Sequence, residues 1–249
     1  MIEWAKDGRD ILNSRTDIDP KEKTRMEHYL ALIEGDIEAI QNSVAQSGLK
    51  TSPLPKPEVQ ATTFTLSTEQ RQALKERARG EKKEVVVYTI QPRSITVQLQ
   101  EDGQYFIFVN DSPNLRELVR PQTFDIAFFV DKKQKWARPI PKSNNSSLQR
   151  QRELIEGDFS QSLNTPGVKA IMAHAYVLTQ ADITHQKKTG TVLIPDYFAR
   201  TPDETFGSVV ADVGRDRPGH RLRVHDWARD DGRDRVWALP AIVSANLEI

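Results

Sequence analysis

The sequence contains no cysteine among its 249 residues, and it carries no excess of either charge. Without cysteine the chain has no thiolate metal site, no cysteine nucleophile and no disulfide, a composition typical of a reducing compartment. Its 35 basic and 35 acidic residues cancel. Any binding of nucleic acid would therefore need a local basic patch, because the molecule as a whole has no attractive net charge.

The sequence also lacks a long apolar run. A helix that crosses a membrane needs roughly 18 or more consecutive apolar residues, whereas 28% of this chain is charged and its apolar stretches are short. The first residues do not show the basic and then apolar layout of a signal peptide. We therefore expect a soluble protein without membrane contact, located in the cytoplasm or in a virion and not secreted through a signal peptide.

Common enzyme signatures are missing as well. The chain has no phosphate-binding P-loop, no dinucleotide-binding glycine fingerprint and no G-x-S-x-G elbow. His174 and His185 are eleven residues apart, which on one helix is roughly 16 Å and too far to share a metal ion. We therefore predict no metal site and no cofactor, and we favour a protein without enzymatic activity.

A strong helix signal lies between Asp19 and Gly48. Asp19 suits an N-cap, Pro20 suits the first helical position and Gly48 suits a left-handed stop. Six apolar residues inside this segment are spaced alternately by four and three positions, which is a heptad pattern. These residues are Met26, Leu30, Ile33, Ile37, Ile40 and Val44. Such a seam packs either on the chain's own domain or on another protein, and its acidic flanking positions argue against a parallel homodimer.

The sequence divides into three parts. Residues 1–50 are predicted to form a helical arm, and residues 51–66 a linker whose three prolines and missing apolar period indicate an extended connector. Residues 67–249 are predicted to form an α+β domain. We expect an antiparallel β-meander with two or three covering helices, preceded by the helical arm and the Pro-rich linker.

Apolar periodicity predicts the elements of this domain. A short helix capped by Ser67 or Thr68 ends at Gly80. The expected strands and helices are strands at 84–90, 94–100, 104–110 and 124–131, helices within 147–186, one of them starting at Pro166, and C-terminal strands within 190–245. Residues 101–103 predict a hairpin turn. The third and fourth strands are apolar throughout, which is typical of central strands.

Two acids and a lysine match, in order, the motif of PD-(D/E)xK nucleases. Asp111 closes one predicted strand, and Asp131 and Lys133 close the next. In such an enzyme two carboxylates hold Mg²⁺ and the lysine stabilises charge in the reaction. The match is loose, because the proline follows Asp111 instead of preceding it. Acid and lysine at a strand end are equally explained by the strand's exit into solvent.

A basic segment follows the fourth strand and is the best candidate for contact with phosphate. Its residues are Lys132, Lys133, Lys135, Trp136 and Arg138. Lysine and arginine neutralise phosphates, and a tryptophan stacks on a base. Acidic residues follow soon after this segment, so an acidic protein surface fits the same residues.

The region from residue 212 to residue 235 interleaves seven arginines with six aspartates. Asp231 and Gly232 predict a hairpin turn within it. Opposite charges on a two-stranded hairpin form cross-strand ion pairs, and such an edge docks on a partner of complementary charge. The interface residues that we predict here are Arg221, Arg223, Arg233 and Arg235.

These patterns favour a structural or adaptor subunit of a larger protein assembly, such as a phage-like particle. In this interpretation the helical arm and the charged C-terminal hairpin bind neighbouring subunits, so the protein forms an oligomer or a hetero-assembly. The alternatives are a metal-dependent nuclease that uses Asp111, Asp131 and Lys133, and a nucleic-acid-binding module that uses the basic segment. The sequence does not identify the partner.

Overall fold

The computed structural model describes residues 62–207, 209–230 and 232–248. The predicted helical arm with its heptad seam, and the linker up to residue 61, lie outside these residues. Within the described part of the chain, no helix is long and apolar enough to cross a membrane.

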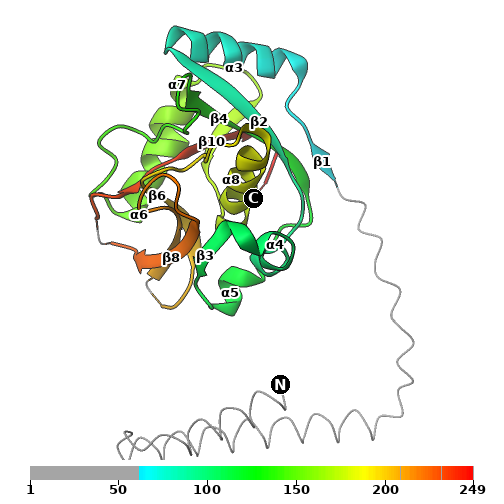
Figure 1. Ribbon diagram of the computed structural model, residues 1–249. Helices are drawn as coiled ribbons and strands as arrows, with labels where there is room; N and C mark the ends of the chain where they lie inside the picture. Colours follow the sequence, from blue (N-terminus) through cyan, green and yellow to red (C-terminus); the bar gives the residue numbers. More distant parts are fainter. Residues whose placement is uncertain (1–61, 208, 231, 249) are drawn as a thin grey trace, which may run out of the picture. The chain divides into compact units, whose positions relative to one another are not determined.

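The predicted α+β class is confirmed, with two mixed five-stranded sheets (Figure 1). The first sheet contains β1 (Thr63–Phe64), β4 (Thr123–Asp131), β10 (Pro240–Ser244), β5 (Val168–Met172) and β2 (Lys83–Ile90), which pairs with β4. The second sheet has the order β3 (Phe106–Val109), β8 (Leu222–Ala228), β7 (Val209–Gly214), β6 (Phe198–Glu204) and β9 (Val236–Trp237). Among the strands that the structure describes, only β6, β7 and β8 form an antiparallel meander.

Strand β4 is the centre of the first sheet, as its apolar sequence predicts. All its residues from Phe124 to Val130 are buried, and it pairs antiparallel with the whole of β2. Successive side chains of β4 point to opposite faces, and they enter two different apolar clusters. Both faces of this sheet are therefore covered, which explains why β4 shows no polar alternation.

Helix α8 (Ala175–Thr189) contacts β2 of the first sheet and β7 of the second (Figure 1). Ten of its residues are buried, including the polar Gln180, Asp182 and His185. It ends at Gly190, whose φ of 73° is the left-handed conformation that suits glycine. Because α8 is covered on several sides, it has little amphipathic pattern in its sequence.

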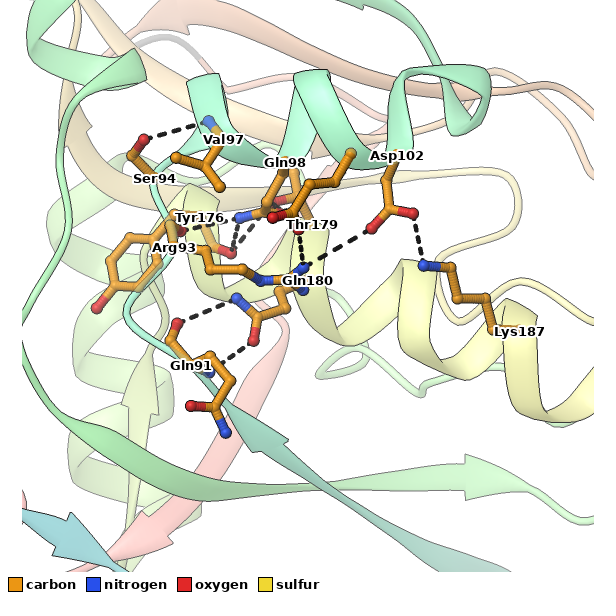
Figure 2. A network of polar contacts seen from close by, with 11 residues as sticks. Gln91, Arg93, Ser94, Val97, Gln98, Asp102, Tyr176, Thr179, Gln180 and Lys187 are labelled. Carbon is orange, nitrogen blue, oxygen red and sulfur yellow. Dashed lines mark hydrogen bonds and ion pairs between the residues drawn. The ribbon is translucent and has the colours of Figure 1, made fainter.

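Helix α4 (Ile95–Asp102) replaces the strand predicted at 94–100. The Ser94 hydroxyl accepts a hydrogen bond from Val97 N at 3.4 Å and caps the helix (Figure 2). Gln98 is buried against α8, where its Nε2 donates to Tyr176 O at 2.9 Å and its Oε1 accepts from Thr179 Oγ1 at 2.9 Å. Because the buried residue Gln98 is polar, the apolar residues of this segment do not show a helical spacing. They alternate with polar residues instead, which is the pattern that predicted a strand.

Other elements near α4 also differ from the prediction. Residues 101–103 end α4 and start a short 3₁₀ turn, η1 (Gly103–Tyr105), so they form no hairpin. Strand β3 lies at the edge of the second sheet and not at its centre, and it pairs in parallel with β8. A short helix, α5 (Pro113–Arg116), follows it.

The helices predicted near Ser67 and Ser147 are present, and each begins with a serine cap. Helix α3 (Thr68–Gly80) starts with a capping box between Ser67 and Gln70. The helix expected at 147–163 exists as three continuous segments with a π-helical middle, namely α6 (Leu148–Arg152), η2 (Glu153–Phe159) and α7 (Ser160–Ser162). The helix expected from Pro166 is wrong in its first part, because residues 168–172 form β5, which pairs with β10.

The last predicted residues of the linker belong to the folded body. Strand β1 pairs in parallel with the start of β4, and Leu66 is buried with its N–H donated to Asp125 Oδ2 at 3.0 Å. A boundary at residue 66 is therefore several residues too late. The prolines that suggested a linker all lie before this point.

The hairpin predicted at Asp231 and Gly232 is wrong as well. Strand β8 pairs with β7 and β3, whereas β9 pairs in parallel with β6. The segment between β8 and β9 therefore connects strands that are not neighbours. Arginine side chains from the charged region 212–235 pair instead with other segments, such as Arg215 with Asp182 and Arg229 with Glu204.

A buried ion pair joins α8 to the second sheet. Arg215, directly after β7, donates two hydrogen bonds to the Asp182 carboxylate, at 2.9 and 2.6 Å, and both side chains are fully buried. Asp182 Oδ1 also accepts from the backbone N–H groups of Leu193 and Ile194, and Arg215 Nε donates to His220 O at 2.8 Å. Buried charges are tolerated only when such partners satisfy them.

We predict that Arg215→Met lowers the free energy of unfolding by roughly 3–5 kcal/mol, because it leaves the Asp182 carboxylate buried without its partner. Urea denaturation followed by circular dichroism measures this change. Arg223→Met is the control: its ion pair with Asp216 is partly exposed, so we expect a loss of about 1 kcal/mol or less. Equal effects of the two substitutions would contradict the role of the buried pair.

Candidate functional site

The candidate site lies on the face of the second sheet that is turned away from α8. Ala211, Val213 and Val224 point to the core that α8 shares, so the alternate residues of β7 and β8 point the other way. In register on that face, Arg200 of β6 lies beside Asp212 of β7, and Asp212 lies beside His225 of β8. We call this the outer face.

A crossing segment covers part of the outer face. Strand β8 ends at Ala228, opposite Val209 at one end of β7, whereas Val236 of β9 lies beside Phe198 at the other end of the sheet. Residues 229–230 and 232–235 therefore lie along β7. The Arg229 carbonyl accepts from Arg200 Nη1 and from Leu148 N, both at 3.0 Å, which holds the segment in place.

An outer-face pocket of about 230 Å³ lies between this segment and the sheet. It is lined by Phe198, Asp212, Asp216, Arg223, His225, Trp227, Arg233, Asp234, Arg235 and Val236. Aromatic rings, arginines and aspartates therefore meet in one hollow, which is the composition of a binding site that combines apolar walls with a few polar groups.

Asp212 is the unusual group of the outer-face pocket. Its side chain is 1% exposed, and neither carboxylate oxygen accepts a hydrogen bond from any described residue. Burial raises the pKa of Asp212 to about 7, although His225 and Arg200 act in the opposite direction. A carboxyl group that titrates near neutral pH inside a pocket is a marker of functional sites.

Aromatic side chains form a row beside Asp212. The ring centroids of Phe108 and His225 are 5.5 Å apart, and those of His225 and Trp227 are 5.7 Å apart. The Arg233 guanidinium lies over the Trp227 ring at 4.6 Å from its centroid. Phe108 is 46% exposed, so this row presents ring surface to solvent on the sheet edge.

A second pocket adjoins the first. The Trp136 pocket, of about 330 Å³, is lined by Trp136, Ala137, Arg138, Pro139, Pro195, Asp196, Tyr197, Asp234, Arg235 and Trp237. Both pockets share Asp234 and Arg235. The three tryptophans of the described residues therefore line one continuous surface together with four arginines, and we call it the Trp/Arg surface.

Five of the predicted binding residues that the structure describes line this surface. Trp136 and Arg138 of the basic segment line one pocket, and Arg223, Arg233 and Arg235 of the charged region line the other. Arg221 is exposed outside both pockets. The sequence treats these residues as two separate groups, and the fold brings them together.

The lysines of the basic segment lie nearby. Lys132 lines a hollow of about 290 Å³ with Lys75, Arg79, Lys83, Glu84 and Val85. Lys135 pairs with Glu84 at 2.5 Å, and Lys133 is exposed in the turn after β4. Lys75 and Arg79 were not predicted, because their helix is far from residue 132 in the sequence.

The three nuclease residues are not brought together in one sheet. Asp111 follows β3 of the second sheet, whereas Asp131 ends β4 of the first. The Asp131 carboxylate accepts from the N–H groups of Lys133 and Gln134 and from Arg138, and the Gln134 N–H contributes most to lowering its pKa to about 2. Among the described residues, no group of three or more histidines and acids is placed to hold a metal ion.

Sequence reasoning missed the central members of the site. Asp212 stands in an apolar strand, and His225 and Trp227 occupy alternate positions of β8 after the core residues Leu222 and Val224. The sequence offers only this alternation, which indicates that these residues share one face of a strand. It does not predict which other residues lie beside them on that face.

Another polar pair, His174 with Asp203, lies at the start of α8. Asp203 Oδ1 contacts the His174 ring, and Asp203 Oδ2 accepts from Ala175 N at 2.5 Å. A carboxylate in this position satisfies a free N–H group at a helix N-terminus. The pair is therefore explained by the folding of α8.

Comparison with protein-family models, with curated proteins and with solved structures found no match for this chain. The functional argument therefore depends on the geometry of the Trp/Arg surface.

We predict that Asp212→Asn stabilises the protein at neutral and alkaline pH. The folded-state pKa is raised, so between about pH 4 and pH 7 the folded protein keeps a proton that the unfolded chain has lost. Stability that depends on this group therefore falls as pH rises through this window. At pH 8 the substitution should raise the free energy of unfolding by an amount on the order of 2–4 kcal/mol.

Urea denaturation of both proteins at pH 4, 6 and 8 tests this prediction. The difference between them should be small at pH 4 and should grow up to about pH 7. Asp111→Asn is the matched control, because Asp111 is exposed. A difference that does not change with pH would show that burial does not perturb Asp212.

Proposed function

We propose that this protein is a non-enzymatic binding module that holds single-stranded nucleic acid on its Trp/Arg surface. The observation that carries the proposal is the joining of two pockets, lined by three tryptophans and four arginines, through Asp234 and Arg235. Proteins that bind single strands combine aromatic rings, on which bases stack, with cationic side chains along the backbone.

The shape of the surface favours a single strand over a duplex. Its aromatic groups lie in hollows of about 230 and 330 Å³, and a base reaches such hollows only when it is unpaired and splayed from its neighbours. The exposed edge of the aromatic row, at Phe108, extends the stacking surface.

Charge is distributed to support the same ligand. Lys132, Lys75 and Arg79 surround one hollow, and among the described residues none of the three has an acidic partner within ion-pair distance. The turn from Lys132 to Trp136 connects this hollow to the Trp136 pocket. Salt screens electrostatic attraction beyond about 10 Å at 0.1 M. A bound phosphate is therefore attracted by the cations near it, and the zero net charge of the whole chain does not prevent binding.

We predict that Trp227→Ala weakens the binding of a fluorescein-labelled (dT)15 oligonucleotide by roughly 5- to 150-fold, since stacking on one aromatic side chain contributes about 1–3 kcal/mol per base. Fluorescence anisotropy measures the affinity. Phe206→Ala is the matched control, because Phe206 is an exposed aromatic residue that lines neither pocket. Equal affinities of the two variants would remove the Trp/Arg surface as the binding site.

Salt dependence gives an independent measure. The logarithm of the affinity should fall linearly with the logarithm of salt concentration, and Lys132→Glu should reduce the slope by about 1 or more. Lys188→Glu lies on α8 outside all three hollows and should leave the slope unchanged. No binding by the native chain at 50 mM salt would end the proposal.

A second candidate function is the structural or adaptor role in a larger assembly. The observation that favours it is the edge strand β3, where Ile107 is 48% exposed and the neighbouring Phe108 is also exposed. Edge strands without charge or proline are open to pairing with another chain. In this proposal β3 adds to the contacts of the helical arm and of Arg221, Arg223, Arg233 and Arg235.

We predict that Ile107→Lys reduces self-association of the full chain, because a charge on the edge strand opposes strand pairing. Size-exclusion chromatography with light scattering gives the mass. Ile107 lines none of the three hollows, so this substitution should leave oligonucleotide binding unchanged. A native chain that is monomeric at 100 µM would count against the assembly role.

A further inference from the structure

Within the described part of the chain, Asp212 lacks the hydrogen-bonding partner that a buried carboxylate requires. It is almost completely buried and both of its oxygens are without a hydrogen bond from the described residues, although Arg200 and His225 lie beside it in the sheet. A buried polar group without a hydrogen bond destabilises the folded state. Because Asp212 also lines the outer-face pocket, a ligand in that pocket can supply the missing donors.

We propose that the outer-face pocket binds a guanine base, whose N1–H and N2–H groups donate to the two carboxylate oxygens of Asp212. This inference rests on the proposed binding of nucleic acid and adds a base preference to it. The ligand is a guanine nucleotide, either free or within a strand, because both present the same edge.

The donor pattern distinguishes guanine from the other bases. A carboxylate offers two acceptor oxygens side by side, and the Watson–Crick edge of guanine offers two adjacent N–H donors. Adenine and cytosine place an acceptor nitrogen beside their amino group, and thymine and uracil place a carbonyl on each side of their N–H. Each of these edges would set an acceptor against a carboxylate oxygen.

The walls of the pocket favour a neutral base over a cation. A guanidinium group also has two adjacent donors, but the pocket is lined by as many arginines (Arg223, Arg233 and Arg235) as aspartates (Asp212, Asp216 and Asp234), so it has no net negative charge to attract a cation. The same arginines attract the phosphate of a nucleotide. A neutral base joined to an anionic phosphate therefore fits the pocket on both counts.

The size and lining of the pocket also suit one base. Its volume of about 230 Å³ is below the roughly 300–1,000 Å³ of sites for drug-sized ligands, so the sugar and phosphate would remain outside. Trp227 and His225 offer ring surface for stacking, and Phe198 and Val236 form an apolar wall. An unstacked base is recognised through this combination of stacking and hydrogen bonds to its edge.

The test compares four oligonucleotides that differ at one position. Fluorescence anisotropy measures the affinity of the full chain for (dT)15 and for versions with a central dG, dA or deoxyinosine. We expect dG to bind roughly 5- to 150-fold tighter than (dT)15, as a good bidentate pair does. Deoxyinosine keeps N1–H but lacks the N2 amino group, so it should retain only part of this gain, and dA should show none.

Asp212→Asn assigns the preference to this side chain. An amide offers one acceptor and one donor, so the ratio of affinities for the dG and dT oligonucleotides should fall to about one. Asp111→Asn is the control and should keep the ratio of the native protein. The denaturation experiment described above shows independently whether the Asp212→Asn variant is folded.

Competition with mononucleotides separates the two sources of guanine. GMP that displaces the dG oligonucleotide, while AMP does not, shows that the base and one phosphate are sufficient. A dG preference without competition by GMP shows that the pocket reads guanine only within a strand. Equal competition by GMP and AMP contradicts the proposal.

The outcomes also distinguish this inference from the proposed function. If all four oligonucleotides bind with equal affinity and Trp227→Ala weakens each of them, the Trp/Arg surface stands and the guanine pocket is wrong. If none of them binds and GMP does not bind, both proposals fail. If the Asp212→Asn variant still prefers dG, the assignment of the preference to Asp212 is wrong, and the binding of nucleic acid by the Trp/Arg surface is not affected.

Discussion

The ion pair between Asp182 and Arg215 is the contact on which the arrangement of the domain depends. It joins α8 to the end of β7, and Asp182 also binds two backbone N–H groups of the loop that leads to β6. Both charges are fully buried, so each is stable there only while the other stays in place. The pair therefore holds the end of β7 against α8, with the apolar residues Ala211 and Val213 of that strand turned inward.

The candidate site follows from this orientation. Since Ala211, Val213 and Val224 face α8, Asp212, His225 and Trp227 must project from the opposite face. The parallel pairing of β9 with β6 then carries residues 229–230 and 232–235 across that face, and it brings Arg233 onto Trp227. Two surfaces that are distant in sequence, one after β4 and one after β8, meet at Asp234 and Arg235.

Asp212 shows how function and stability can oppose each other in one residue. Its carboxyl group has a pKa raised to about 7 by burial, so the folded state is less stable when this group is charged. Within the described part of the chain both of its buried oxygens lack a hydrogen bond. A base with two adjacent N–H groups in the outer-face pocket would supply the missing donors.

Local patterns in the sequence determined the α+β class, the buried strand β4, the capped helix α3 and the helix that begins near Ser147, because caps and apolar runs act over a few residues. They also selected Trp136, Arg138 and three further arginines as candidates, which the structure places around the two pockets. Only the tertiary structure decided that residues 95–102 are helical, because Gln98 hydrogen-bonds with α8. It also decided that β9 pairs with β6, that β3 is an edge, and that Asp212 lies in a pocket with Trp227, since these contacts join residues that are far apart in the chain.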